Sequence, residues 1–236
     1  LYSFAKGKGF IITVFTNGCL LNKKITRYFQ KKPPFVVEIT LNAVTKDLYE
    51  HISQVKGSFH KALRGIDLLI KNRIPFKIKT QMTKDNYREL KRIRQFVRRL
   101  GVQHSFIPFL NARLNGDVSP CHLRLDPEIF RKRRKELLTE REFQLCDYRE
   151  KIAGNQEYIR ETFGNGGLFN CAITSKDTFF IDPYGNMSLC NLLRRDQVNL
   201  LQKEIEDGLG VLVEKVKREK PVSSFRCESC RLREAC

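Results

Sequence analysis

Short apolar segments alternate with amphipathic segments along the first half of the chain, and this alternation constrains the fold more than any other feature. The apolar segments are rich in β-branched and aromatic residues and cover residues 9–15, 35–41, 75–82 and 102–110. Between them, apolar residues recur at helical spacing in residues 22–32, 58–70 and 86–100. Strands that alternate with helices of this length form βαβ units. The sequence therefore predicts an α/β fold with a parallel sheet or part of an α/β barrel.

The residues that follow these strands are the first candidates for a functional site. In parallel sheets and barrels, reactive groups gather at the carboxyl ends of the strands. Those ends lie here at residues 15–18, 40–42, 81–83 and 108–110. Glu38 is different, because it lies inside an apolar strand. We expect it either to face the barrel interior, toward a substrate or a cation, or to be a paired structural charge.

Helix caps are predicted from local signals. Ser58 precedes an apolar stripe and is expected to cap its helix. Asn86 with Glu89 has the spacing of a capping box, and Gly101 is the expected end of the same helix.

Beyond residue 110 the alternation of apolar and amphipathic segments ends. Turn formers fill residues 111–120, and Asp126-Pro127 begins a long charged helix. Two short apolar runs flank Asp182-Pro183-Tyr184-Gly185, which fits a type I turn in a β-hairpin. A last helix is predicted at residues 208–217. We therefore divide the chain into residues 1–120, linking helices at 121–165, and a cysteine-rich domain at 166–236.

Cysteines dominate the final third of the chain. Three of the eight fall within its last ten residues, at Cys227, Cys230 and Cys236, while Cys171 and Cys190 flank the predicted hairpin. Two thiols separated by two residues can bind one metal centre, which normally takes four protein ligands. Because no targeting segment is evident, metal or cluster binding is favoured over disulfides.

The chain carries a formal net charge of +18. Basic residues concentrate on predicted helices, at residues 91–99 and 131–135. Solvated helix faces account for such runs. The alternative is that they bind an acidic partner, such as a peptide, an RNA or a membrane surface. No apolar run approaches the roughly 20 residues that a membrane span needs. We expect a soluble, cytoplasmic protein that does not bind membranes.

The cysteine spacing of the C-terminal region resembles that of a known domain. Cys171, thirteen residues, Gly185, four residues and Cys190, followed by Cys227-x2-Cys230-x5-Cys236, is similar to the SPASM extension of radical S-adenosylmethionine enzymes. The preceding region resembles the later strands of the partial (β/α) barrel of the same superfamily. The segments that carry this likeness are Thr16-Asn17-Gly18, residues 38–42, Gly57-Ser58-Phe59 and Thr83-x2-Asn86.

This resemblance implies cofactors and ligands. It assigns Cys171 and Cys190 to one auxiliary [4Fe–4S] cluster and Cys227, Cys230 and Cys236 to a second, with remaining ligands beyond the chain's end. Cys19, Cys121 and Cys146 match no ligand position and are expected in the core, with Cys121, which follows Pro120 near the domain boundary, as the first candidate for an exception. Thr16, Asn17, Thr40 and Asn42 stand where similar enzymes bind S-adenosylmethionine. Residues of these types also cap turns, so both interpretations stay open.

The Cys-x3-Cys-x2-Cys motif that defines the superfamily is absent from this sequence. The simplest expectation is that the chain starts at the third strand of the barrel, so that this piece alone is inactive. A degenerate, non-catalytic homologue is the alternative.

The resemblance implies an oxidoreductase-type enzyme that generates a 5′-deoxyadenosyl radical to modify a peptide or protein. Sulfatase maturation and the modification of ribosomal peptides are examples, and a ferredoxin or flavodoxin is the expected reductant. The alternative is a non-catalytic zinc- or cluster-binding module that binds nucleic acid or acidic partners through its basic surface.

Overall fold

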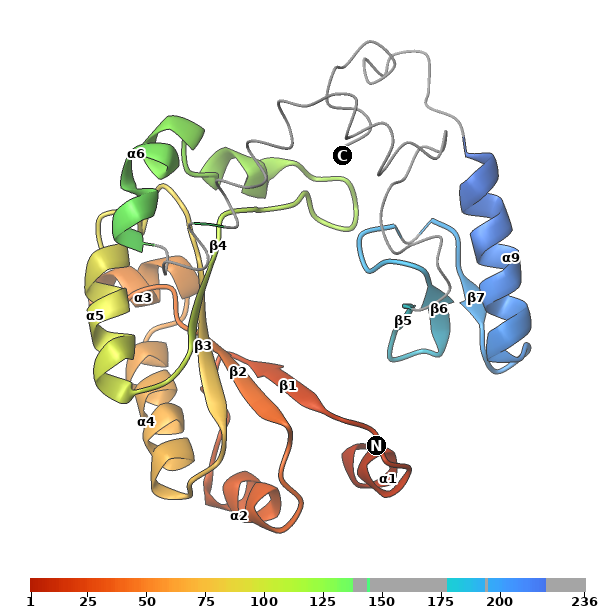
Figure 1. Ribbon diagram of the computed structural model, residues 1–236, viewed down its shortest axis with the longest axis horizontal. Helices are drawn as coiled ribbons and strands as arrows, with labels where there is room; N and C mark the ends of the chain where they lie inside the picture. Colours follow the sequence, from red (N-terminus) through yellow and green to blue (C-terminus); the bar gives the residue numbers. More distant parts are fainter. Residues whose placement is uncertain (138–143, 145–177, 194, 220–236) are drawn as a thin grey trace. The chain divides into compact units, whose positions relative to one another are not determined.

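The computed structural model describes residues 1–137, 144, 178–193 and 195–219 (Figure 1). The chain divides into two compact units, residues 1–140 and 141–236, which are described in turn. The division into three parts that the sequence indicated stays a prediction.

The first unit is built on a sheet of parallel strands in the order β1-β2-β3-β4 (Figure 1). The strands are β1 (Thr13–Thr16), β2 (Val36–Thr40), β3 (Phe76–Gln81) and β4 (His104–Ile107). Every neighbouring pair is parallel. The predicted α/β class and the sequence positions of the four strands are confirmed, although each strand is shorter than its apolar run.

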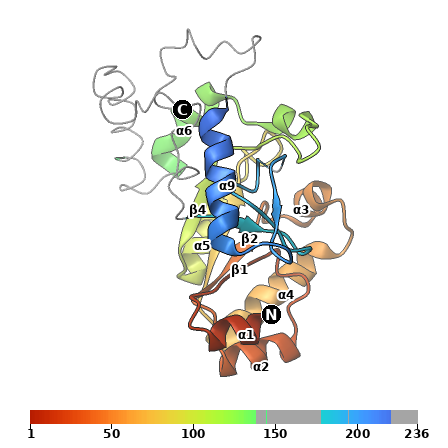
Figure 2. The same cartoon turned by 90° about the vertical axis from the view of Figure 1, so that its right-hand side faces the viewer.

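Helices precede, connect and follow these strands. They are α1 (Tyr2–Gly7), α2 (Lys23–Lys31), α3 (Lys46–Ser53), α4 (Ser58–Lys71), α5 (Leu90–Leu100), the 3-10 helix η1 (Ser119–Leu123) and α6 (Pro127–Leu137). Figure 1 shows α4 and α5 on one face of the sheet, and Figure 2 gives the view turned by 90°. The sequence did not indicate α1 or α3.

The two faces of the sheet differ because side chains alternate along a strand. On β2, Val37 and Ile39 are fully buried in the core with Ala62 and Leu69 of α4. Glu38 is directed to the opposite face, where it meets lysines of β3. One face therefore forms the apolar core, and the other carries charge.

Two of the predicted helix caps are wrong. Ser58 is the first residue of α4, Gly57 is its cap, and the Ser58 hydroxyl instead donates to the carbonyl of Val55 at 2.7 Å. Helix α5 begins only at Leu90, and Glu89 makes no capping bond. Glu89 binds the distant loop after β2, and Asn86 bonds both to that loop and to the nearby backbone of Gln81 and Thr83. Local spacing could not reveal the contacts with the distant loop. Gly101 ends α5 with φ of 68°, as predicted.

The described part of the second unit is a small antiparallel sheet with one helix. Its strands are β5 (Phe180–Ile181), β6 (Asn186–Ser188) and β7 (Val198–Asn199), followed by α9 (Ile205–Arg218). The predicted hairpin is confirmed, since Oδ1 of Asp182 accepts hydrogen bonds from the N–H groups of Tyr184 and Asn186 at 2.8 and 3.0 Å. Met187 packs with Leu212 and Val213 of α9 in a separate core.

Candidate functional site

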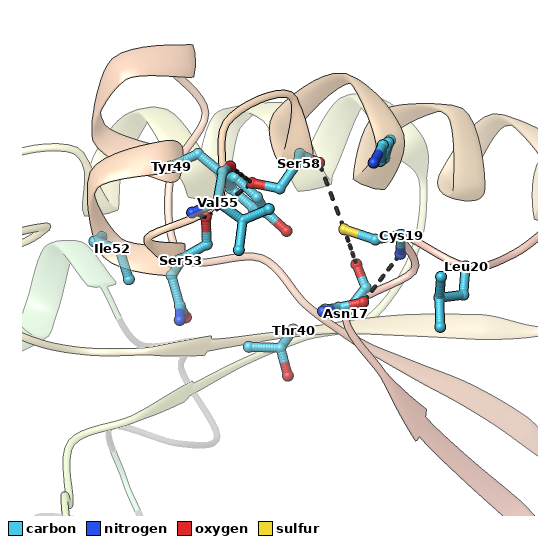
Figure 3. Close-up of a pocket in the computed structure, with 11 residues that line it drawn as sticks. Asn17, Cys19, Leu20, Thr40, Tyr49, Ile52, Ser53, Val55 and Ser58 are labelled. Carbon is cyan, nitrogen blue, oxygen red and sulfur yellow. Dashed lines mark hydrogen bonds between the residues drawn. The ribbon is translucent and has the colours of Figure 1, made fainter.

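A pocket opens at the carboxyl ends of β1 and β2, the edge at which the sequence predicted the functional site. Its volume of about 380 Å³ falls in the range of roughly 300–1,000 Å³ typical of small-molecule sites. Figure 3 shows residues of the loop after β1 and of α3 and α4 around it. Its walls are Asn17, Cys19, Leu20, Thr40, Asn42, Tyr49, Ile52, Ser53, Val55, Ser58 and Lys61. The pocket thus brings together Asn17, Thr40 and Asn42, whereas Thr16 does not line it.

The turn after β1 is held by its own side chains. Oγ1 of Thr16 accepts a hydrogen bond from the N–H of Gly18 at 3.1 Å, and Oδ1 of Asn17 accepts one from the N–H of Cys19 at 3.0 Å. Such bonds between a side chain and the nearby backbone stabilise turns. Thr16 therefore caps this turn, and a role for it toward a cofactor stays a prediction.

Two glycines allow this turn to lie directly against α4. Gly18 has φ of 78°, a left-handed conformation that L side chains rarely adopt. A Cβ atom at Gly65 of α4 would lie only 2.2 Å from the carbonyl oxygen of Gly18. The missing side chain at Gly65 thus permits the contact that positions Asn17 and Cys19 beside α4.

Cys19 is half-buried against the core and also lines the pocket, which sequence reasoning did not foresee. Its thiol donates to the carbonyl oxygen of Ser58 at 3.5 Å (Figure 3). Burial, and then the adjacent Cys19 thiol, raise the pKa of the Tyr49 hydroxyl. Tyr49 therefore keeps its proton and presents a neutral hydroxyl at the pocket wall. The one signal for Cys19 in the sequence was its place directly after Asn17-Gly18.

The end of β2 contributes two further polar side chains. Thr40 is the last residue of β2, and its hydroxyl makes no hydrogen bond to the residues that the structure describes. It is therefore available to a ligand. Oδ1 of Asn42 accepts a hydrogen bond from the backbone N–H of Gln81 at 2.9 Å. The side-chain nitrogen of Asn42 is accordingly the group that remains for a ligand.

The loop after β2 is tied down by two buried residues from the segment before α5. Asn86, fully buried, donates to the carbonyl oxygens of Asn42 and Gln81 at 2.9 and 2.8 Å. Glu89, 9% exposed, accepts hydrogen bonds from the N–H of Val44 at 3.0 Å and from the hydroxyl of Thr45. These bonds hold the loop that leaves the pocket wall. Sequence reasoning missed this role, because both residues matched a helix cap.

Of the predicted metal ligands, only Cys190 lies among the described residues. It directly follows Leu189 at the end of the hairpin, is half-buried, and its sulfur accepts a hydrogen bond from the N–H of Leu192 at 3.4 Å. Such N–H···S bonds tune cluster-bound thiolates. Cys171, Cys227, Cys230 and Cys236 lie outside the described residues. Within the described ranges, no three His, Cys, Asp or Glu side chains form a group that could hold a metal ion.

Comparison of the sequence with known proteins gives one informative relative. No family model matches the chain. Over 111 residues, or 47% of the chain, it is 25% identical to the AdoMet-dependent heme synthase of Methanosarcina barkeri (strain Fusaro / DSM 804). The match spans about a third of that protein, 32% of its length.

Solved structures extend the similarity to the whole chain. SuiB of Streptococcus suis bound to S-adenosylmethionine aligns with a TM-score of 0.64 and 14% identity, over 100% of this chain and 56% of SuiB. The fold is that of radical S-adenosylmethionine enzymes. Native anSMEcpe with bound AdoMet aligns with a TM-score of 0.58 and 17% identity, over 95% of this chain and 64% of that one. A further anSMEcpe structure, with AdoMet and the Kp18Cys peptide, aligns with a TM-score of 0.55, 16% identity and the same coverage.

These comparisons confirm the predicted resemblance at the level of fold. The chain spans a third to about two thirds of the length of the proteins it matches. None of the helices in the described part of the chain has both the length and the apolar character needed to cross a membrane.

Proposed function

We propose that this chain is part of a radical S-adenosylmethionine enzyme that modifies a peptide or protein, and that the pocket between β1, β2, α3 and α4 binds S-adenosylmethionine. The observation that carries the proposal is the position of this pocket, at the carboxyl ends of the strands in a fold shared with structures that contain this cofactor. When bound and reduced by one electron, S-adenosylmethionine supplies a 5′-deoxyadenosyl radical for hydrogen abstraction.

The residues of the pocket fit such a ligand. The free hydroxyl of Thr40 and the side-chain nitrogen of Asn42 can bind ribose hydroxyls or the methionine carboxylate. Lys61 lines the same pocket and forms no ion pair within the part of the chain that the structure describes, so it can pair with a carboxylate. Leu20, Ile52 and Val55 line the same pocket and would give the adenosyl group an apolar surface to pack on.

Auxiliary clusters form a further part of the proposal. The half-buried Cys190 sulfur, which accepts an N–H bond from Leu192, has the environment of a cluster ligand. With Cys171 it would hold one [4Fe–4S] cluster, and Cys227, Cys230 and Cys236 would hold part of a second. A peptide substrate is supported by the likeness to anSMEcpe, two solved structures of which contain AdoMet and a peptide.

Cofactor binding is tested by equilibrium dialysis of the full chain, purified without oxygen, against radiolabelled S-adenosylmethionine. The Thr40→Val variant keeps the shape of the side chain and removes the hydroxyl, so binding is expected to weaken by about 0.5–1.5 kcal/mol. Thr13→Val is the matched control, since Thr13 lies at the opposite end of β1. Equal losses in the two variants, or no binding by the unaltered chain, would count against the proposal.

The clusters are tested separately by assaying iron, acid-labile sulfide and zinc in the anaerobically purified protein. We expect iron and sulfide in equal amounts, and a lower content of both when Cys190 is replaced by Ala. Zinc without sulfide, together with salt-dependent RNA binding, would instead favour the nucleic-acid-binding module.

A further inference from the structure

An ion cluster lies on the face of the sheet opposite to α4 and α5. Oε2 of Glu38 on β2 lies 2.7 Å from Nζ of Lys77, and Oε1 lies 2.9 Å from Nζ of Lys79, both on β3. Glu38 is 7% exposed, whereas the two lysine side chains are 31% and 30% exposed. The carboxylate is therefore enclosed, whereas both lysine side chains remain partly exposed to solvent.

The two lysines and the ionised Glu38 together carry a net charge of +1. Burial of Glu38 opposes ionisation, but the hydrogen bonds and charges of Lys77 and Lys79 outweigh it and lower the pKa of this carboxyl. An ionised Glu38 neutralises one lysine and leaves the other unbalanced. Each ammonium has three N–H groups and uses one on Glu38. Neither lysine bonds to another acceptor among the residues described here.

An apolar surface adjoins the unbalanced charge. Phe15 on β1 is paired in register with Glu38, and the residue is 66% exposed. Nζ of Lys79 lies 5.2 Å from the centre of the Phe15 ring. A large exposed aromatic ring beside a half-buried cation is a surface for a ligand that combines an anionic group with an apolar one.

The cluster also adjoins the proposed cofactor pocket. Lys79 is paired in register with Thr40, which lines that pocket. Neighbouring strands are roughly 4.8 Å apart. A ligand held by Lys79 would therefore reach the end of the sheet where Thr40 lies.

We propose that Lys77 and Lys79, held in place by Glu38, bind a carboxylate of the substrate, and that the apolar group next to this carboxylate packs on Phe15. This proposal rests on the proposed function and names its substrate class. The excess of one positive charge matches a monoanionic carboxylate and would leave a phosphate dianion unbalanced. In a peptide, an acidic side chain beside an apolar side chain has this chemistry.

The test uses 3-phenylpropionate as the probe and its uncharged amide, 3-phenylpropionamide, as the comparison. Binding to the full chain is measured by ligand-observed NMR in the presence of S-adenosylmethionine. We expect the acid to bind at least about tenfold more tightly than the amide, as for a hydrogen bond to a charged group. In Lys79→Met and in Lys77→Met this preference should fall to about twofold or less.

Lys71→Met is the matched control, because Lys71 is an exposed lysine paired with Asp67 at 2.7 Å on the surface of α4. It should keep the full preference for the acid. Equal binding of acid and amide by the unaltered chain overturns the proposal, even where a variant fails to fold. A preference that survives in both folded variants overturns it as well. S-adenosylmethionine binding is recorded in the same samples, so a failure of the cofactor pocket is recognised independently of the carboxylate site.

Discussion

Substitution of Gly65 by Ala tests whether contact between α4 and the turn after β1 builds the pocket. An added Cβ would lie 2.2 Å from the carbonyl oxygen of Gly18 and 3.0 Å from its carbonyl carbon. Both are backbone atoms and cannot rotate away as a side chain would. Either the turn or the helix must therefore shift. Because Asn17 and Cys19 belong to this turn, the pocket wall must change with it.

The expected loss of stability is the difference between two effects. Overpacking a core costs about 1–3 kcal/mol, and a clash with backbone belongs at the upper end of this range. Alanine is favoured over glycine inside a helix by about 1 kcal/mol. We therefore expect Gly65→Ala to lower the free energy of unfolding by about 1–2 kcal/mol, and to weaken S-adenosylmethionine binding further than this loss of folded protein explains.

Urea unfolding followed by far-UV circular dichroism measures the first effect, since the chain has no tryptophan for fluorescence. Equilibrium dialysis under conditions where the variant is folded measures the second. Gly7→Ala is the control in the same unit, because a Cβ there meets nothing within 4 Å. If Gly65→Ala were as stable as Gly7→Ala and bound the cofactor as well, the reasoning would be refuted.

Two further predictions concern buried polar groups of the first unit. Asn86→Ala leaves the N–H of Thr83 and the carbonyls of Asn42 and Gln81 without their partner, so we expect the free energy of urea unfolding to fall by about 2–4 kcal/mol. Asn115→Ala, at an exposed turn, is the control. A similarly small change in both variants would contradict this prediction. Burial, and then the charge of Arg94, lower the pKa of His104 from 6.5 to about 4. The unfolded chain binds this proton below pH 6.5 and the folded chain only near pH 4, so the stability that His104 contributes is complete above pH 6.5 and is lost as the pH falls toward 4. This loss of stability amounts to roughly 3 kcal/mol. In His104→Gln the urea midpoint should therefore change less between pH 6.5 and pH 4 than in the unaltered chain. The same pH dependence in both proteins would assign it to other groups.

Local patterns predicted the elements that local forces determine. Val37 and Ile39 gave the position of β2, and Gly101 gave the end of α5, because the responsible interactions lie within a few residues. The turn at Asp182 was likewise predictable, since its side chain bonds to backbone groups no more than four residues away. The pocket edge followed from a general property of parallel sheets.

Contacts between segments far apart in the sequence could not be predicted from local patterns. Glu89 looked like part of a helix cap, but its carboxylate is used by Val44 and Thr45, which are more than forty residues away. Helix α3 was missed because its few apolar residues, such as Tyr49, show their role only once α4 packs beside them. From the sequence, Glu38 could either face a substrate or a cation or be a paired structural charge. Its ion pairs with Lys77 and Lys79 on β3 became visible only in the structure.

Side chains along β2 alternate between the apolar core and the proposed binding sites. Ile39 faces the helices, whereas Glu38 and Thr40, its neighbours in sequence, belong to the charged face and the pocket. A register slip of one residue would exchange the two faces, so the apolar core fixes which side chains reach a ligand. The same parallel register sets Glu38 beside Lys77 and Thr40 beside Lys79. Lys79→Met should therefore alter ligand preference with little change in the core, whereas a core substitution at Ile39 should lower stability and disturb both sites together.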